Sequence, residues 1–180
     1  MTKEELAAVL AEHKAWLEGN GGKRANLAYA SLVGARLVDA RLDGASLAYA
    51  RLDGARLDGA RLVDASLAYA RLDGASLVGA RLDGARLDGA RLDGANLTGA
   101  KINAKTAIGI LRRATRSDGY EFFLWHCQEG YFIKAGCRFL DMEAARQHWN
   151  NTRQGTALVD ESLDILDFFA AAIKRQEVAQ

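Results

Sequence analysis

Apolar and polar positions repeat at an interval of five residues between Ala25 and about Asn103. Alanine occupies every fifth position from 25 to 100, sixteen times without a break. A leucine follows each alanine two positions later, from Leu27 to Leu97, and Ile102 takes the last such position. This spacing matches neither the 3.6-residue period of an amphipathic helix nor the two-residue period of a strand. Because a five-residue unit cannot bury its own leucine, the units must stack and share one core.

The repeat unit reads Ala-(Arg/Ser/Asn)-Leu-x-x, and it resembles the unit of the pentapeptide-repeat family, Ala-(Asp/Asn)-Leu-x-x. The resemblance implies a mainly β fold, a right-handed quadrilateral β-helix with four pentads per coil. Residues 23–103 would then form four coils, with the leucines in four inward columns twenty residues apart. Stacked strands lie ~4.8 Å apart, so leucine side chains would fill the interior and leave no room for a ligand.

Most units carry arginine and aspartate on either side of the leucine, followed by glycine, as in Arg51-Leu52-Asp53-Gly54. The glycine suits a corner that requires a positive φ. Residues 25–100 contain nine arginines and nine aspartates. Because the two charges alternate, we expect a solvated lattice of ion pairs. The other interpretation of the arginine columns is a basic ladder for nucleic-acid phosphates.

One column of corner residues differs from the others, because it holds Tyr29, Tyr49 and Tyr69. Their spacing of twenty residues would place the three rings one above another on the outside of the coils. The column is our candidate interaction surface, and the alternative is a purely structural ladder that covers the corner backbone. Since tyrosine tolerates a positive φ poorly, we expect this corner to use a different turn from the glycine corners.

Residues 1–22 are predicted to form an N-terminal capping helix, because Thr2 and Glu5 match a capping box. Apolar residues then recur at helical spacing over 3–17, and the glycine-rich segment 19–22 ends the helix. His13 lies on the apolar stripe, where we expect a partly buried side chain rather than a ligand. The stripe would cover the open first coil, since solenoids need such caps.

Residues 104–180 are predicted to form a C-terminal α+β cap. The segment 104–116 is expected to be a short transition. Strands over 120–127 and 131–140 would make a β-hairpin. Two helices would follow, one capped by Asp141 and reaching about Trp149, the other beginning at Asp160.

No arrangement of residues typical of catalysis was found, so the sequence predicts a non-enzymatic protein without cofactor or metal. His126, Cys127, Cys137 and His148 lack the spacing of a zinc site. In the predicted hairpin Cys127 would pair with Phe132 and Cys137 with the strand before it, at Phe122. The two thiols would then lie on opposite faces and remain reduced. No phosphate-binding loop or nucleophile motif is present.

The composition limits the possible partners. The formal net charge is +1, which argues against a strong field for nucleic acid. No apolar run approaches the ~20 residues that span a bilayer, so no membrane partner is expected. The N-terminus lacks the layout of a signal peptide, and the two cysteines are expected to stay reduced, so we expect a cytoplasmic protein. We expect either an unidentified protein partner or no partner, and a chain that is either a monomer or a homodimer.

Two functions fit this sequence. The first is a designed consensus scaffold with natural-looking ends, suggested by the uniform repeat modules. The second is a natural bacterial or phage protein that acts by protein–protein contact. The resemblance implies that some relatives imitate duplex DNA and act on type II topoisomerases through acidic surfaces. Here Arg, Ser, Asn or Lys precedes the core leucine where those relatives often carry Asp, which argues against DNA mimicry. A nucleic-acid binder that uses the arginine columns is a third hypothesis.

Overall fold

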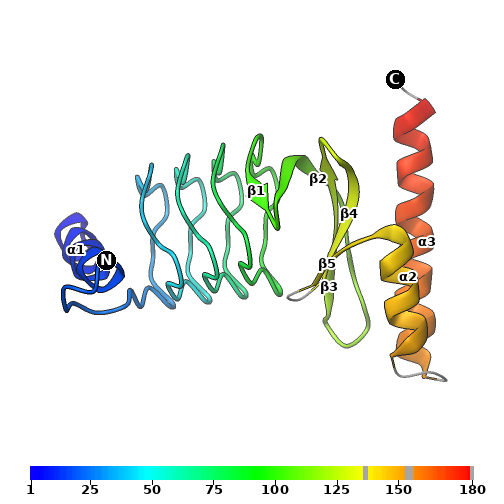
Figure 1. Ribbon diagram of the computed structural model, residues 1–180, viewed down its shortest axis with the longest axis horizontal. Coiled ribbons are helices and arrows are strands. Elements are labelled where there is room, and N and C mark those ends of the chain that lie inside the picture. The colour runs from blue at the N-terminus through cyan, green and yellow to red at the C-terminus, as the bar shows by residue number, and fades with distance from the viewer. Residues whose placement is uncertain (136–137, 153–155, 179–180) are drawn as a thin grey trace. The chain divides into compact units, whose positions relative to one another are not determined.

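The computed structural model describes residues 1–135, 138–152 and 156–178, and it divides the chain into two compact units. The first unit is Met1–Ala107 and the second is Ile108–Gln180. Figure 1 shows helix α1 and the stacked coils in blue to green, and strands and two further helices in the later part of the chain. Each unit is described here by itself, so the capping role expected for residues 104–180 stays a prediction.

Helix α1 (Lys3–Leu17) opens with the predicted capping box. The Thr2 hydroxyl accepts a hydrogen bond from the Glu5 N–H at 3.1 Å, and the Glu5 carboxylate accepts one from the Thr2 N–H at 2.8 Å. The apolar stripe is covered only in part, since Leu6 is half-buried and Trp16 is 42% exposed. His13 is the buried residue of the helix, more deeply buried than its position on the stripe predicted.

The repeat forms a β-solenoid in which each residue lies beside the residue twenty positions later. Parallel bridges join these positions from Asn26 and Ser46 to Arg81 and Lys101. The hydrogen bonds follow the same rule: the Leu52 N–H donates to the Arg71 carbonyl at 2.6 Å. The N–H of the alanine that begins the next pentad donates to the leucine carbonyl three residues before it, which closes a β-turn at each corner.

The repeat leucines fill the interior of the solenoid, as predicted. All fifteen are at most 8% exposed, and Leu52 and Leu62 are completely buried. The alanines of the inner coils, such as Ala55 and Ala65, are also completely buried beside the corners. Each leucine contributes roughly 2 kcal/mol by burial, so this column packing is the main stabilising term of the first unit.

The prediction of a separate turn type for the tyrosine corner was wrong. Tyr29, Tyr49 and Tyr69 have φ values of 60°, 59° and 57°, in the same left-handed region as Gly54 at 64°. From Tyr29 to Gly79 each corner N–H donates to a carbonyl of the next coil, for example Tyr49 to Ala68 at 2.8 Å. This ladder fixes the corner backbone whatever the side chain, so tyrosine adopts a conformation that usually favours glycine.

The solenoid passes into an antiparallel strand pair where a short transition was expected. Strand β1 (Lys101–Ile102) pairs with the beginning of β2 (Lys105–Thr115). The Ala107 N–H donates to the Ala100 carbonyl at 2.7 Å, so the start of β2 continues the hydrogen bonding of the last repeat. The eleven residues of β2 replace the predicted irregular segment 104–116.

Residues 120–141 form one strand more than the hairpin predicted for 120–140. These antiparallel strands are β3 (Glu121–Cys127), β4 (Gly130–Ala135) and β5 (Arg138–Asp141), and the second unit also contains most of β2. The prediction of one continuous strand over 131–140 was therefore wrong. Strand β4 ends at Ala135 and β5 begins at Arg138, and the two strands pair with each other; residues 136 and 137 lie outside the described residues. The side chains of Phe122, Leu124 and Ile133 pack in a buried cluster with both helices.

Helix α2 (Met142–Asn151) begins as predicted, because the Asp141 carboxylate accepts from the Ala144 N–H at 2.8 Å. Helix α3 (Ala157–Val178) begins three residues before the predicted Asp160. Trp149, Leu166 and Phe169 give the two helices their part of the buried cluster. No helix in the described part of the chain has the length and apolar character that crossing a membrane requires.

The hairpin register also differs from the prediction. Cys127 lies opposite Gly130, and Phe132 lies opposite Trp125, because the turn consists of residues 128 and 129 rather than 129 and 130. Cys127 is a buried thiol. Phe122 pairs with Ala135 and not with Cys137 as predicted. Because Cys137 lies outside the described residues, the prediction that the two thiols are reduced and lie on opposite faces stays a prediction.

Candidate functional site

The three predicted tyrosines form a stacked ladder on the outside of the first unit. The ring centroids of Tyr29 and Tyr49 are 4.9 Å apart with an interplanar angle of 2°, and those of Tyr49 and Tyr69 are 4.9 Å apart at 10°. The side chains remain 75%, 47% and 53% exposed in chain order. Stacked aromatic pairs contribute about 0.5–1.5 kcal/mol beyond their buried area, which offsets part of the strain at these corners.

The ladder has one open end and one closed end. Tyr29 is its most exposed member, and no ring stacks on its other face in the described residues. At the other end the Tyr69 ring lies against Gly89, the residue that occupies the same corner one coil later. The ladder therefore presents rigid apolar ring edges and three phenol hydroxyls to solvent, a combination typical of protein-binding surfaces.

Most charges on the rest of the repeat are paired in the lattice that the sequence predicted. Arg71 binds Asp53 of the preceding coil at 3.0 Å, and Arg91 binds Asp73 in the same way at 3.0 Å. A hydrogen bond from the Ser76 hydroxyl is the main cause that lowers the pKa of Asp58. Each arginine of these pairs is about half exposed, so the individual pairs stabilise little, while their fields cancel at a distance.

His13 has a structural role in the first unit. Its Nδ1 accepts a hydrogen bond from the Ala25 N–H at 3.0 Å, which joins α1 to the start of the first coil. Nε2 is buried and has no hydrogen-bond partner among the residues that the structure describes. Burial lowers the pKa of His13, against the opposing effect of the Asp43 carboxylate. The predicted assignment of His13 to the core rather than to a ligand site agrees with this arrangement.

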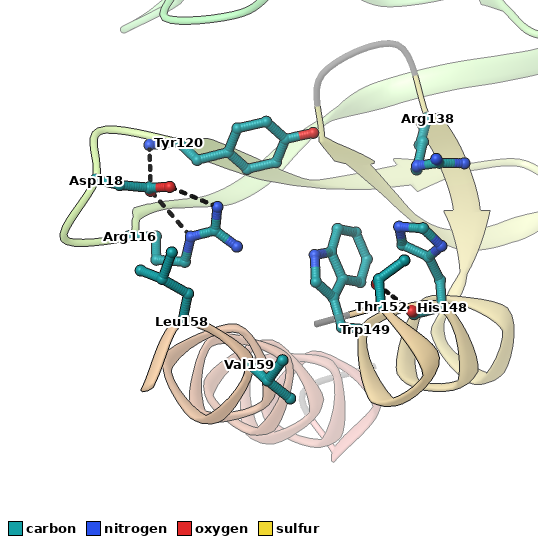
Figure 2. A pocket seen from close by; sticks show the side chains of 9 residues that line it. All are labelled: Arg116, Asp118, Tyr120, Arg138, His148, Trp149, Thr152, Leu158 and Val159. Carbon is teal, nitrogen blue, oxygen red and sulfur yellow. Dashed lines mark hydrogen bonds and ion pairs between the residues drawn. The ribbon is translucent and has the colours of Figure 1, made fainter. Parts of the chain in front are cut away.

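The second unit contains a cavity of about 300 Å³ between the strands and the helices. Figure 2 shows Arg116, Asp118 and Tyr120 on one side of it, His148 and Trp149 of α2 on another, and residues of α3 below. The complete lining is Arg116, Asp118, Tyr120, Arg138, His148, Trp149, Thr152, Leu158 and Val159. Its walls are thus mixed, with aromatic rings beside two guanidinium groups.

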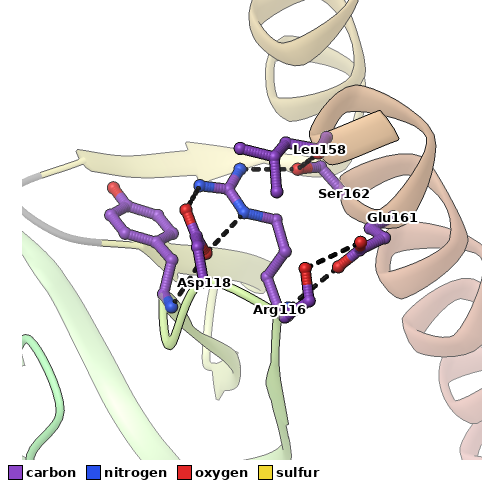
Figure 3. A network of polar contacts seen from close by, with 7 residues as sticks. Arg116, Asp118, Leu158, Glu161 and Ser162 are labelled. Atoms are coloured by element: carbon purple, nitrogen blue, oxygen red, sulfur yellow. Dashed lines mark hydrogen bonds and ion pairs between the residues drawn. The ribbon is translucent and has the colours of Figure 1, made fainter. Parts of the chain in front are cut away.

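The Arg116 guanidinium is almost completely buried and has partners on two elements (Figure 3). It donates to the Asp118 carboxylate at 2.9 and 2.7 Å, and to the Ser162 hydroxyl of α3 at 3.0 Å. These bonds lower the pKa of Asp118 to about 2. The Glu161 carboxylate accepts from both the N–H and the hydroxyl of Ser117 at 2.8 Å. The network therefore attaches the turn before β3 to α3.

The imidazole of His148 is a titratable ring of the cavity lining. Burial and the nearby Arg138 lower the pKa of His148, which keeps the imidazole neutral at neutral pH. The His148 and Trp149 rings meet edge to face, with their centroids 4.9 Å apart. No nucleophile–base pair is present among the described residues that line the cavity. Within the described ranges, no group of three or more His, Cys, Asp or Glu side chains is arranged to hold a metal ion.

Sequence reasoning named the tyrosine ladder but missed the cavity and its network. The sequence suggested no functional role for Asp118, and it predicted Ser162 only as part of a helix. Arg116 and Ser162 are 46 positions apart, and no motif links them. A buried arginine also contradicts the usual preference of this residue for the surface, so composition offered no signal.

Comparison with known proteins identifies the repeat. The family model for pentapeptide repeats matches residues 23–59 and 60–99 with eight copies. No curated protein matches the sequence.

Several solved structures are similar to parts of the chain. A pentapeptide repeat protein of the Arabidopsis thaliana thylakoid lumen is 35% identical, with 43% of this chain and 54% of that one covered and a TM-score of 0.42. HetL from Nostoc sp. strain PCC 7120, a protein involved in heterocyst differentiation regulation, is 42% identical, with 42% and 39% covered and a TM-score of 0.24. The chain thus spans about half the length of these two relatives.

A further pentapeptide repeat protein, from Nostoc PCC 7120, is 32% identical. It is covered over 79% of its own length and 53% of this chain, with a TM-score of 0.27. The eight matched copies coincide with the stacked coils described above, whose period of twenty residues is that of a right-handed β-helix built from pentads. The chain belongs to the pentapeptide-repeat family.

Proposed function

We propose that this protein is a non-enzymatic scaffold that acts by protein contact, with the ladder Tyr29, Tyr49 and Tyr69 as its contact surface. The observation that carries the proposal is the ladder itself. Three aromatic rings are held parallel to one another, and each side chain is about half exposed or more. They stand at a corner whose positive φ is unfavourable for tyrosine. Rigid, exposed aromatic residues lose little conformational entropy on binding, which suits them to protein interfaces.

The packing of the first unit supports a role without catalysis. Pentapeptide-repeat proteins are generally non-enzymatic. In this chain the interior is filled by leucine and alanine side chains that are nearly all inaccessible to water. A substrate would therefore have to bind on the outer surface, where most charged groups are already paired. A surface of this kind suits recognition by shape and exposed side chains rather than chemistry.

The proposed scaffold consists of four coils of four pentads each, with α1 covering the first coil. The bridges between positions twenty residues apart support this count, because sixteen pentads divide into four such turns. The hydrogen bond from the Ala25 N–H to His13 supports the role of α1. Outward positions can change without altering the leucine core, which makes the repeat suitable for presenting side chains.

Both origins that the sequence suggested are compatible with this function. The uniform alanines, leucines and outward modules favour a designed consensus scaffold. A natural protein that works by protein–protein contact would use the same ladder. The origin of the gene distinguishes the designed scaffold from the natural protein: a designed gene is synthesised, and a natural one is recovered from a genome.

The ion-pair lattice argues against both nucleic-acid hypotheses. A DNA mimic must present carboxylates that are not neutralised nearby, and a nucleic-acid binder must present unpaired cations. In the inner coils Asp53 contacts Arg51 and Arg71, and Asp73 contacts Arg71 and Arg91. The field of such alternating charges decays within about one Debye length, ~8 Å at physiological salt.

A comparison of three bait proteins, the wild type and two variants, tests the proposal. In the first variant Tyr29, Tyr49 and Tyr69 are changed to serine. In the matched control two exposed valines outside the groove next to α1, Val38 and Val78, are changed to serine, since these are also outward-facing and lie on the same unit. Each bait is incubated with an extract of the source or host cell, and bound proteins are quantified by mass spectrometry. We expect at least one protein bound equally by wild type and control and lost with the tyrosine variant.

Equal capture by all three baits would contradict the proposed contact surface. Circular dichroism of each bait shows whether the coils remain folded, so that loss of binding is not confused with unfolding. Because a mixed extract can yield indirect contacts, the captured protein is then purified and its affinity for each bait is measured by calorimetry. A tenfold weaker affinity of the tyrosine variant is the expected result.

A further inference from the structure

A groove lies between α1 and the first coil within the first unit, and none of the three ladder tyrosines lines it. Its volume is about 590 Å³. Leu6 and Leu10 of α1 form one wall, and Leu32 and Val33 of the coil form the other. Val33 is 51% exposed, and both helix leucines are only half-buried, so apolar surface on both walls faces solvent.

The floor of the groove includes backbone groups without partners. In the inner coils, the residue before each leucine makes two hydrogen bonds to the preceding coil. The Arg51 N–H donates to the Ala30 carbonyl at 2.9 Å, and the Arg51 carbonyl accepts from the Leu32 N–H at 2.7 Å. Ser31 and Arg36 hold the same position in the first coil, where no coil precedes them. Neither residue's N–H or carbonyl has a hydrogen-bond partner within the described part of the chain.

The groove is also positive. Lys3 and Arg36 line it, and neither forms an ion pair with any other described residue. None of its lining residues carries a carboxylate. This distinguishes Arg36 from the arginines of the inner coils, such as Arg56, which is bound to Asp58 at 3.1 Å. A partner for this surface should therefore supply negative charge together with apolar side chains.

We propose that the groove binds an acidic and apolar peptide segment of a partner protein, which adds to the first coil as a further pentad. The segment would run parallel to residues 31–36 and turn with them at the corner between Leu32 and Ala35, so that it pairs with Ser31 before the turn and with Arg36 after it, since coils pair in parallel throughout the repeat. Its carbonyls accept from the N–H groups of Ser31 and Arg36, and its own N–H groups donate to their carbonyls. An apolar side chain enters between Leu10 and Leu32, while acidic side chains reach Lys3 and Arg36.

A second copy of the chain is a poorer occupant than such a peptide. The same edge of another copy carries the same unpaired cations, so Lys3 and Arg36 would face their own counterparts. Like charges that face each other at an interface weaken association. The inference goes beyond the contact function assigned to the tyrosines, because the groove is formed by other residues and has a different chemistry.

The test uses a displayed library of random octapeptides, selected on the full-length protein and counter-selected on an Arg36→Glu variant. The selected peptides should combine acidic residues with alternating apolar ones. The best of them is synthesised and its affinity measured by fluorescence anisotropy. Arg36→Glu should weaken binding at least tenfold. Arg86→Glu, in a later coil where Arg86 is paired with Asp88 at 3.4 Å, is the matched control and should leave the affinity unchanged.

Two further measurements report the binding mode. Amide hydrogen exchange at Ser31 and Arg36 should slow at least tenfold in the complex, while exchange at the tyrosine corners stays unchanged. A peptide methylated at alternate backbone nitrogens cannot donate to the coil and should bind at least tenfold more weakly. The proposal is overturned if no peptide is enriched, if Arg86→Glu weakens binding as much as Arg36→Glu, if protection appears at the tyrosines instead, or if the protein alone dimerises through this edge.

Discussion

The ring of Tyr69 lies against the α-carbon of Gly89, in the space that a β-carbon at position 89 would need. The two residues occupy the same corner in successive coils. Tyr69 is the last ring of the ladder, and it uses the space that glycine leaves open at position 89. Glycine also suits the φ of 63° at this corner.

Replacing Gly89 with alanine should destabilise the solenoid more than the same change at Gly74. Both glycines have a positive φ, 63° and 67°, so each substitution carries a left-handed strain on the order of 1 kcal/mol. Only Gly89→Ala also creates an overlap with a ring, since no atom lies within 4 Å of a β-carbon at Gly74. Urea unfolding followed by circular dichroism measures the difference. If Tyr69→Ala does not reduce it, the contact is not its cause.

Changing Leu62 to alanine should lower the free energy of unfolding by about 2–5 kcal/mol, because the side chain is completely buried within the stack. Leu62→Asp places an unpaired charge at the same site and should prevent folding. Val78→Ala is the control, since Val78 is 39% exposed and its change should stay within about 0.5 kcal/mol. Thermal melting of the three variants would contradict the packing if Leu62→Ala melted like wild type.

Acidification should destabilise the first unit through His13. Its pKa in the folded protein is lowered from the usual 6.5, chiefly by burial. As the pH falls, the His13 imidazole therefore becomes protonated in the unfolded chain at a higher pH than in the folded protein. The contribution of the neutral ring to stability is complete above about pH 6.5 and is lost as the pH falls toward the lower folded pKa. Asp43, Arg24 and Arg41 are the charged groups that influence this ring.

His13→Asn isolates this effect, because the asparagine side-chain oxygen can replace Nδ1 as acceptor for the Ala25 N–H. The variant should be less stable than wild type at pH 7, and the difference should shrink at about pH 5. Melting temperatures at both pH values provide the measurement. A difference that does not depend on pH would show that the imidazole does not titrate in this way.

The pair of Arg116 and Asp118 should make the second unit sensitive to stronger acid. The folded pKa of Asp118 is about 2, below its usual 3.8. The pair's contribution is therefore present above about pH 4 and is lost as the pH falls toward 2. Asp118→Asn should lower the melting temperature by a few degrees at pH 7 and make it less dependent on pH below 4. Asp160→Asn, an acidic residue of the first turn of α3 outside the network, serves as control.

The protein should not inhibit DNA supercoiling by gyrase, or protect gyrase from quinolones, even at high micromolar concentration. The reason is the pairing of its surface charges, such as Arg71 with Asp53 at 3.0 Å and Arg91 with Asp73 at 3.0 Å. A gel assay of supercoiling provides the measurement. Inhibition at sub-micromolar protein that disappears with Asp53→Asn and Asp73→Asn would establish the mimicry that the charge pattern argues against.

The sequence by itself determined the repeat and its core. In this solenoid each residue lies beside the residue twenty positions away, so the contacts can be predicted from the repeat period alone. The burial of Leu52 and Leu62, the pairing of arginine with aspartate and the stacking of the tyrosines could all be predicted for this reason. The capping box at Thr2 and the helix cap at Asp141 were equally predictable, since both depend on residues three positions apart.

Only the tertiary structure decided the corner conformation of the tyrosines, the hairpin register and the Arg116 network. The tyrosine φ follows from hydrogen bonds between coils, which override the preference of the single residue. A shift of one residue in the turn before Gly130 moved every partner of β3, which the mixed apolar pattern of that strand did not determine. Arg116 and Ser162 meet across 46 residues without any period, because a compact α+β unit is held by contacts that do not repeat.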